Sequence, residues 1–257
     1  MNVDDPVSDL VAQVWKREAA VIVGALTRIL RDLALAEEIA QDAVVAALER
    51  WPTDGVPDNP GAWLMTTAKH RALNHMKRAD RHARDVDDND VIAEEEERVN
   101  DDVLRLLFLS CHPSLPADAR VALTLRVVAG LTTAEIARAF LSTEPTIAQR
   151  IVRAKRTLGD AGISIDDDIA ADEMADRLRS VLDVVYLAFN EGYSATGGTE
   201  NVKTELVAEA LRLARLLADT APNEPEVHAL VALTHLQASR DRARVRAGEP
   251  VLLADQD

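Results

Sequence analysis

One stretch near the middle of the chain carries polar side chains suited to reading duplex DNA. Residues 144–158 have the periodicity of a helix, and one of its faces is polar and basic. Its candidate DNA-binding residues are Thr146, Gln149, Arg150, Arg153 and Arg156. Glutamine and arginine can make paired hydrogen bonds to base edges in the major groove, and cations suit phosphates. An ordinary helical hairpin with a solvated basic face has the same pattern.

A second candidate surface lies on the predicted helix at residues 62–78. Its outer stripe combines an aromatic ring with polar and basic side chains: Trp63, Thr67, His70, Asn74, Lys77 and Arg78. Such a face suits unstacked single-stranded bases, because the ring stacks on a base while cations hold phosphates. In the alternative interpretation, Trp63 packs on Trp51 and on the proline-rich loop at residues 52–60.

Residues 35–51 predict an amphipathic helix whose polar side carries Glu38, Gln41, Asp42 and Val45. An acidic face with an apolar residue in its middle is typical of a docking surface for a basic partner. A solvated helix face looks similar, so the spacing alone leaves both interpretations open.

Residues 186–198 predict a helix that runs into a loop. Its candidate regulatory residues are Phe189, Asn190, Glu191, Gly192, Tyr193 and Ser194. These residue types suit a ligand pocket, a catalytic Glu/Tyr/Ser site or a loop docked on the preceding domain. We favour the docked loop, because one acid without a histidine or metal partner is a weak basis for catalysis. We expect no enzyme activity, no metal and no other cofactor, and we interpret Cys111 beside His112 as a buried thiol.

The elements that position these residues are predicted to be helices. Residues 131–158 predict a helix-turn-helix, in which Thr132 and Glu135 have capping-box spacing and Ser142 or Thr143 begins the second helix. Its buried stripe would be Ile147, Ile151, Ala154 and Leu158. Aromatic residues make up 3% of the 257 residues, and no long stretch alternates apolar and polar residues, so we expect an all-α fold. No apolar run is long enough for a membrane span and no leader is evident, which favours a cytoplasmic protein.

Charge is segregated along the chain. The net charge is −1 over residues 1–84, −9 over 85–102, +4 over 103–165 and −9 over 166–257. We therefore predict a first helical domain at 1–84, a flexible acidic linker at 85–102, a helix-turn-helix domain at 103–162 and a helical extension at 163–257. Within the extension, residues 203–218 and 226–238 predict an antiparallel helical pair. Residues 251–257 show no evident cap, as in a truncated or naturally short extension.

Three segments in this order resemble a bacterial sigma factor of the extracytoplasmic-function (ECF) group, in the sigma-70 family. They are AEEIAQDAVVAALERW at 36–51, NPGAWLMTTAKHRALNHMKR at 59–78, and RVALTLRVVAGLTTAEIARAFLSTEPTIAQRIVRAKRTL at 120–158. The resemblance covers about the first 160 residues. The remaining third resembles the tetratricopeptide-like extension of one ECF subgroup, apparently used in place of a separate anti-sigma protein.

The resemblance implies roles for each candidate surface. The face with Glu38 and Val45 would dock on the clamp helices of RNA polymerase core, and the face with Trp63 would capture and melt the −10 promoter element. The helix with Gln149 and Arg153 would read the −35 element as duplex. The extension would contact the chain's own sigma domains and regulate them, and the free protein would be a monomer. The alternative is a helix-turn-helix regulator that acts without polymerase.

Overall fold

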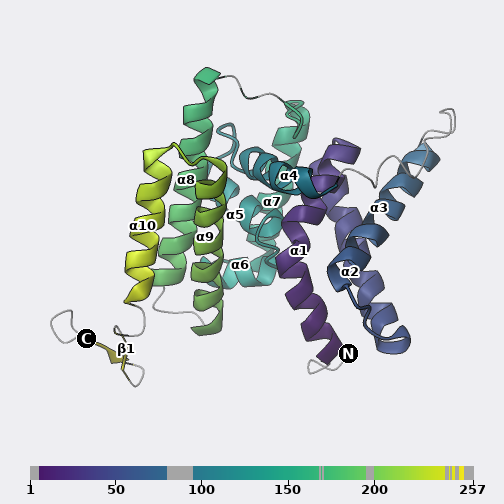
Figure 1. Ribbon diagram of the computed structural model, residues 1–257, viewed down its shortest axis with the longest axis horizontal. Coiled ribbons are helices and arrows are strands. Elements are labelled where there is room, and N and C mark those ends of the chain that lie inside the picture. The colour runs from purple at the N-terminus through teal and green to yellow at the C-terminus, as the bar shows by residue number, and fades with distance from the viewer. Residues whose placement is uncertain are drawn as a thin grey trace.

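The computed structural model describes residues 6–79, 95–167, 169, 171–194, 200–240, 243, 245–246 and 249–251. Figure 1 shows a body built from helices, which confirms the all-α prediction. The described residues also include two short antiparallel strands near the carboxyl end, β1 (Val245–Arg246) and β2 (Glu249–Pro250), with Val245 opposite Pro250.

The first domain consists of α1 (Pro6–Leu30), α2 (Leu33–Asp54) and α3 (Pro60–Ala79). Asp32 caps α2, because its carboxylate accepts hydrogen bonds from the backbone N–H groups of Ala34 and Leu35 at 2.8 and 3.1 Å. The three helices share a core that includes the fully buried Leu26, Ala40 and Leu64.

The second domain contains α4 (Glu95–Ser110), α5 (Ala117–Val127), α6 (Thr133–Ala139) and α7 (Glu144–Asp160). The predicted flexible linker at 85–102 is wrong over residues 95–102, which form the first turns of α4. Asp102 is buried against α1, where it accepts two hydrogen bonds from Arg28 at 3.1 and 3.2 Å. This pair fixes the first turns of α4 on α1; residues 85–94 of the predicted linker lie outside the described residues.

The extension contains α8 (Ala171–Ser194), α9 (Glu200–Thr220) and α10 (Pro225–Ser239), which lie side by side in Figure 1 with α10 outermost. The loop predicted at Phe189, Asn190, Glu191, Gly192, Tyr193 and Ser194 is wrong, because these residues form the last turns of α8. Phe189 and Tyr193 stack with their ring centroids 5.4 Å apart. This pair, one helical turn apart, stabilises the helix across Gly192, which costs only about 1 kcal/mol relative to alanine.

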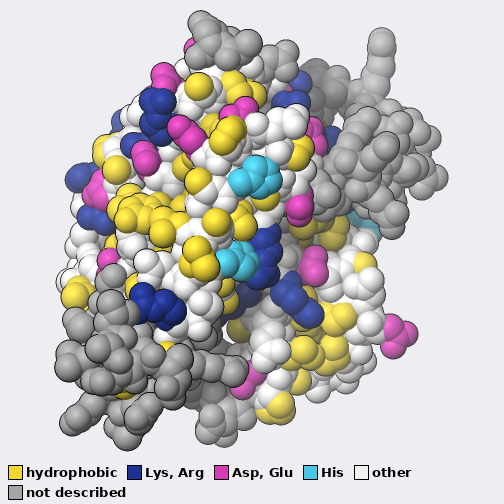
Figure 2. Space-filling model, turned by 60° about the vertical axis from the view of Figure 1, so that its left-hand side comes forward, with side chains coloured by type: hydrophobic (Ala, Val, Ile, Leu, Met, Phe, Trp, Pro, Cys, Tyr) yellow, Lys and Arg dark blue, Asp and Glu magenta, His cyan; other side chains and the backbone are white. Residues whose placement is uncertain are grey.

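The extension packs on the second domain through α4, α5 and α6. Arg120 on α5 donates a hydrogen bond to the Ser180 hydroxyl on α8 at 2.8 Å, and Arg212 on α9 donates to the Val128 carbonyl at 3.4 Å. The opposite face of the extension exposes apolar side chains, among them Leu233 and Leu236 on α10. Figure 2 shows hydrophobic side chains gathered on that side of the molecule.

The first two domains meet at the turn between α5 and α6. The Trp15 indole on α1 donates a hydrogen bond to the Gly130 carbonyl at 3.1 Å. Gly130 has a φ of +67°, and a Cβ atom there would lie 3.0 Å from the Ala19 side chain. Glycine therefore allows both the turn and the close approach of α1.

A buried cluster of three charges joins the same domains. Glu37 on α2 accepts a hydrogen bond from Arg126 Nε on α5 at 2.5 Å and pairs with Lys155 on α7. The Glu37 side chain is only 8% exposed. Burial works to raise the pKa of this carboxyl, but Lys155 and Arg126 outweigh it and hold the pKa below its ordinary value of 4.5. The stabilisation is therefore complete above pH 4.5 and is lost as the pH falls through the lowered pKa.

Replacing Glu37 with glutamine should open the interface between the first two domains. Glu37→Gln leaves Arg126 and Lys155 partly buried without their shared counter-charge, which costs up to about 3 kcal/mol of stability. Spin labels on exposed positions, introduced as Glu49→Cys and Asp160→Cys, would report the distance between α2 and α7. The distance distribution should lengthen and broaden.

Glu38→Gln is the matched control, because Glu38 is the exposed neighbour of Glu37. It should leave the interspin distance unchanged. A single, unchanged distance in the Glu37→Gln protein would show that the charge cluster does not hold the domains together.

Candidate nucleic-acid interfaces

The helix-turn-helix is built as the sequence predicts. Thr132 and Glu135 form a reciprocal capping box at the start of α6, and Thr143 caps α7. The turn between the helices contains Leu141, which has a φ of +47°. Thr133 donates a hydrogen bond to the Glu144 carboxylate at 3.0 Å and so ties the two helix starts together.

The buried side of α7 is the predicted stripe: Ile147, Ile151, Ala154 and Leu158. On the outer side, Thr146, Gln149, Arg153 and Arg156 are exposed, and Arg156 pairs with Asp160 at 3.3 Å. Arg150 instead turns toward α5, where it pairs with Asp118 at 3.0 Å and is only 29% exposed. The structure thus brings Gln149, Arg153 and Arg156 together on one exposed polar face and places Arg150 at its edge.

The outer face of α3 carries the second candidate surface. His70, Asn74, Lys77 and Arg78 are exposed along it, whereas Thr67 is half-buried. Trp63 is also half-buried, and its ring meets that of Trp51 edge to face, with centroids 5.5 Å apart and planes at 70°. The packing interpretation of Trp63 therefore holds for one edge of the ring, while the helix aligns the ring with the polar residues that follow it.

The candidate docking face of α2 is open to solvent. Glu38 and Asp42 are exposed, Asp42 pairs with Arg71 at 3.2 Å, and Val45 is 50% exposed. Gln41 is half-buried, and its side-chain nitrogen is buried without a hydrogen-bond partner in the structure. The face therefore combines the carboxylates of Glu38 and Asp42 with the exposed apolar side chain of Val45.

Family models match this arrangement of domains. "Sigma-70 region 2" matches residues 14–82, "Sigma-70, region 4" matches residues 105–158, and a "family of unknown function (DUF6596)" matches residues 177–257. The ECF RNA polymerase sigma factor SigK of Mycobacterium ulcerans is 29% identical over 58% of this chain and 84% of its own length. The chain is thus similar to the ECF group of the sigma-70 family over its first two domains.

Two further relatives are longer than this chain. An uncharacterized protein of Rhizobium meliloti is 45% identical over 91% of this chain. The probable ECF RNA polymerase sigma factor SigI of Mycobacterium tuberculosis is 30% identical over 64% of this chain. The chain spans 58% of the length of each. No solved structure matches the chain.

Two exposed apolar residues lie on the candidate faces without having been predicted there. Val152 is 62% exposed in region 4 and lies between Gln149 and Arg156 on α7. Leu48 is 37% exposed in region 2, one turn after Val45. Their helical spacing from Val45 and from Gln149 and Arg156 places them on these faces, although apolar residues usually lie in the core.

The described residues contain no group of three side chains suited to binding a metal ion. Nor does any of their helices have the length and apolar character needed to cross a membrane. Cys111 is buried beside Thr124, with 3.2 Å between its sulfur and the hydroxyl oxygen. Burial raises the pKa of the Cys111 thiol to about 11, although hydrogen bonds with Thr124 and Ser110 lower it.

Cys111 should therefore resist thiol reagents in the native protein. At pH 8 only about one thiol in a thousand would be ionised, and the thiolate is the reactive form. Ellman's reagent should titrate no thiol in the folded chain and one in 8 M urea. Rapid modification of the folded protein at pH 8 would contradict the placement of Cys111 in the core of region 4.

Proposed function

We propose that this chain is a sigma factor that binds RNA polymerase core and directs it to a class of promoters. The observation that carries the proposal is a pair of exposed nucleic-acid-type faces on two different domains, α3 in region 2 and α7 in region 4. A regulator that reads duplex DNA alone would need only α7. The proposed domain limits are 1–84 and 103–162, with the extension at 163–257.

Region 4 would read the −35 element through the major groove. Gln149, Arg153 and Arg156 supply hydrogen-bond donors for base edges and phosphates. Val152, between them, suits contact with a thymine methyl group. Arg150, held by Asp118, would contact the backbone at the margin of the groove.

Region 2 would open the −10 element by binding bases after they leave the duplex. Extruding a base costs a few kcal/mol, and stacking on an aromatic ring returns about 1–3 kcal/mol. Trp63 supplies the ring, while His70, Asn74, Lys77 and Arg78 offer hydrogen bonds and charge along the next turns of α3. No covalent step is required of the sigma factor, and RNA synthesis belongs to the polymerase.

The face of α2 with Glu38, Gln41, Asp42 and Val45 would dock on the clamp helices of the core enzyme. Its carboxylates suit a basic partner, and Val45 and Leu48 supply apolar area at its centre. This face is exposed while regions 2 and 4 are in contact, so polymerase has access to it in the closed protein.

The closed arrangement does not fit promoter DNA. Helices in contact lie about 8–10 Å apart, so α3 and α7, which both contact α2, are on the order of 20 Å apart there. The −10 and −35 elements are centred about 25 base pairs apart, or about 85 Å along B-form DNA. Regions 2 and 4 must therefore separate, and the Glu37 cluster must break, before both elements are read.

We further propose that the extension regulates this separation. The extension is hydrogen-bonded to region 4 at two places, Arg120 to Ser180 and Arg212 to the Val128 carbonyl. It leaves Gln149 and Arg153 on α7 exposed. Regulation would then act on the position of region 4 and not by covering its DNA-reading face.

Arg153→Ala should weaken binding to −35 duplex DNA by about 1–3 kcal/mol, roughly five- to 150-fold, because it removes a side chain from the centre of the reading face. Fluorescence anisotropy with duplex promoter fragments would measure the loss. Arg179→Ala removes an exposed arginine of the extension and should have no effect. Equal losses in both variants would indicate general electrostatic attraction and not reading by α7.

Trp63→Ala should spare duplex binding but reduce promoter opening by the reconstituted holoenzyme at least fivefold, since one stacking contact is lost. Permanganate footprinting of unpaired thymines would measure the opening. Trp63→Phe should restore part of it, because it keeps an aromatic ring beside Trp51. Equal opening by the alanine variant and the natural protein would remove Trp63 from the −10 site.

Val45→Asp should reduce capture of purified RNA polymerase core about tenfold or more, because it places a charge at the centre of the docking face. The pull-down is performed without DNA. Val56→Asp is the matched control, since Val56 is 41% exposed in the loop before α3. No capture of core by the natural chain would favour the polymerase-independent regulator.

A further inference from the structure

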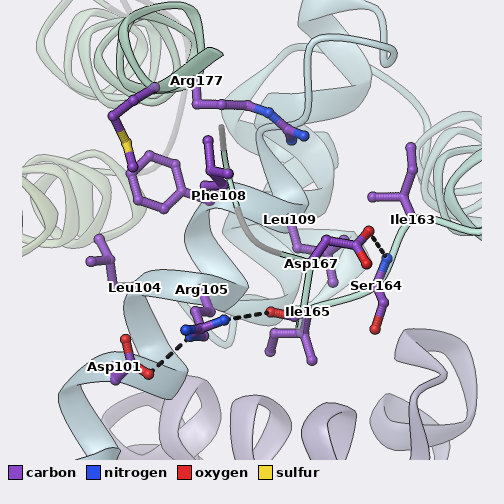
Figure 3. Close-up of a pocket in the computed structure, with 12 residues that line it drawn as sticks. Asp101, Leu104, Arg105, Phe108, Leu109, Ile163, Ser164, Ile165, Asp167 and Arg177 are labelled. Atoms are coloured by element: carbon purple, nitrogen blue, oxygen red, sulfur yellow. Dashed lines mark hydrogen bonds and ion pairs between the residues drawn. The ribbon is translucent and has the colours of Figure 1, made fainter. Parts of the chain in front are cut away.

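A cavity of about 370 Å³ lies where region 4 meets the extension. Its walls come from α4, from the segment at 163–169 that follows α7, and from the beginning of α8. Figure 3 shows Leu104, Phe108 and Ile165 around this space. The volume is at the lower end of the range of about 300–1,000 Å³ for small-molecule sites.

Most of the cavity lining is apolar. Phe108 and Leu104 on α4, Ile163 and Ile165 in the connecting segment, and Met174 on α8 supply aliphatic and aromatic surface. Apolar walls favour an organic group. They do not favour a free inorganic ion, because the ion would lose its hydration without gaining polar contacts.

Three of the four charged side chains in the lining already have close partners. Arg105 pairs with Asp101 at 2.9 Å and donates to the Ile165 carbonyl at 3.5 Å. Asp167 accepts a hydrogen bond from the backbone N–H of Ser164 at 2.8 Å, within its own turn. These contacts hold the walls in place, and Figure 3 shows them at the lower and right-hand sides of the cavity.

Arg177 is different. Its side chain is only 13% exposed, yet within the described residues its contacts are limited to a 3.7 Å ion pair with Glu173, which is 59% exposed. No hydrogen bond satisfies its five N–H donors there. A half-buried guanidinium without a hydrogen-bond partner favours a bidentate anion, and a carboxylate matches its geometry.

We infer that this cavity binds a small monocarboxylate with an apolar body, whose carboxylate pairs with Arg177 and whose hydrocarbon part lies against Phe108 and Met174. The binding site itself is independent of the proposed promoter function. Its regulatory meaning rests on that function: because the walls belong to both region 4 and the extension, an occupied cavity would strengthen the grip of one on the other.

The test uses the full-length chain and 4-phenylbutyrate as the probe. The chain has four methionines, of which Met174 lines the cavity while Met65 and Met76 lie on α3. With ¹³C-methyl-methionine, the probe's ring should shift the Met174 signal at millimolar or lower concentration and leave the Met65 and Met76 signals in place. The neutral amide 4-phenylbutyramide should bind at least tenfold more weakly.

Arg177→Gln should weaken binding of 4-phenylbutyrate about tenfold or more, whereas Arg177→Lys, which keeps a cation, should lose less. Arg179→Gln is the matched control on the same helix, because Arg179 is 65% exposed and pairs with Asp176. Unchanged Met65 and Met76 signals would verify that each variant is folded.

The inference is overturned if Met174 does not respond to 4-phenylbutyrate, if the amide binds equally well, or if Arg177→Gln binds as tightly as the natural chain. None of these measurements involves polymerase or DNA. A negative result for ligand binding in the cavity would therefore not affect the promoter proposal. A negative result for promoter binding would not affect the cavity proposal.

Discussion

Regions 2 and 4 share one buried carboxylate at their interface, beside the packing of α4 on α1. Glu37 is the shared counter-charge of Arg126 and Lys155, and the three groups come from α2, α5 and α7. Removing charges from water is costly, and their attraction repays the cost only while the geometry is kept. Opening the interface partway would leave these charges buried without their partners, which is the costly state. The hydrogen bond of Trp15 to Gly130 and the ion pair of Lys16 with Glu135 also join α1 to the second domain.

Helix α2 links this closure to the proposed docking of polymerase. Glu37 points into the interface, while its neighbour Glu38 lies on the exposed face. Successive residues on a helix point about 100° apart, so both surfaces belong to one rigid element. A shift of α2 on docking would reach the Glu37 cluster directly. The cluster responds steeply because a small displacement ends its short contacts with Arg126 and Lys155.

Local features were predictable from the sequence, and tertiary ones were not. The capping box of Thr132 and Glu135 involves neighbours along one chain segment, so spacing alone revealed it. The helical periods of the extension were visible for the same reason, apart from the last turns of α8, which were predicted as a loop and in which Phe189 stacks on Tyr193. Nothing near Arg150 or Lys155 in the sequence shows that Asp118 and Glu37 bind them. Arg150 was counted with the basic face, yet the fold pairs it with Asp118 at the edge of that face.

The position of the extension limits how it can regulate. α8 and α9 pack on α4, α5 and α6, and the reading face of α7 stays exposed. An acidic extension that worked as a mimic of DNA would instead cover Gln149 and Arg153. The extension also adds bulk to region 4, which must move as one body when the Glu37 cluster breaks. Under the proposed regulation, the point of control would be the joint between α4 and α8, where the half-buried Arg177 lies in the wall of a cavity shared by both domains.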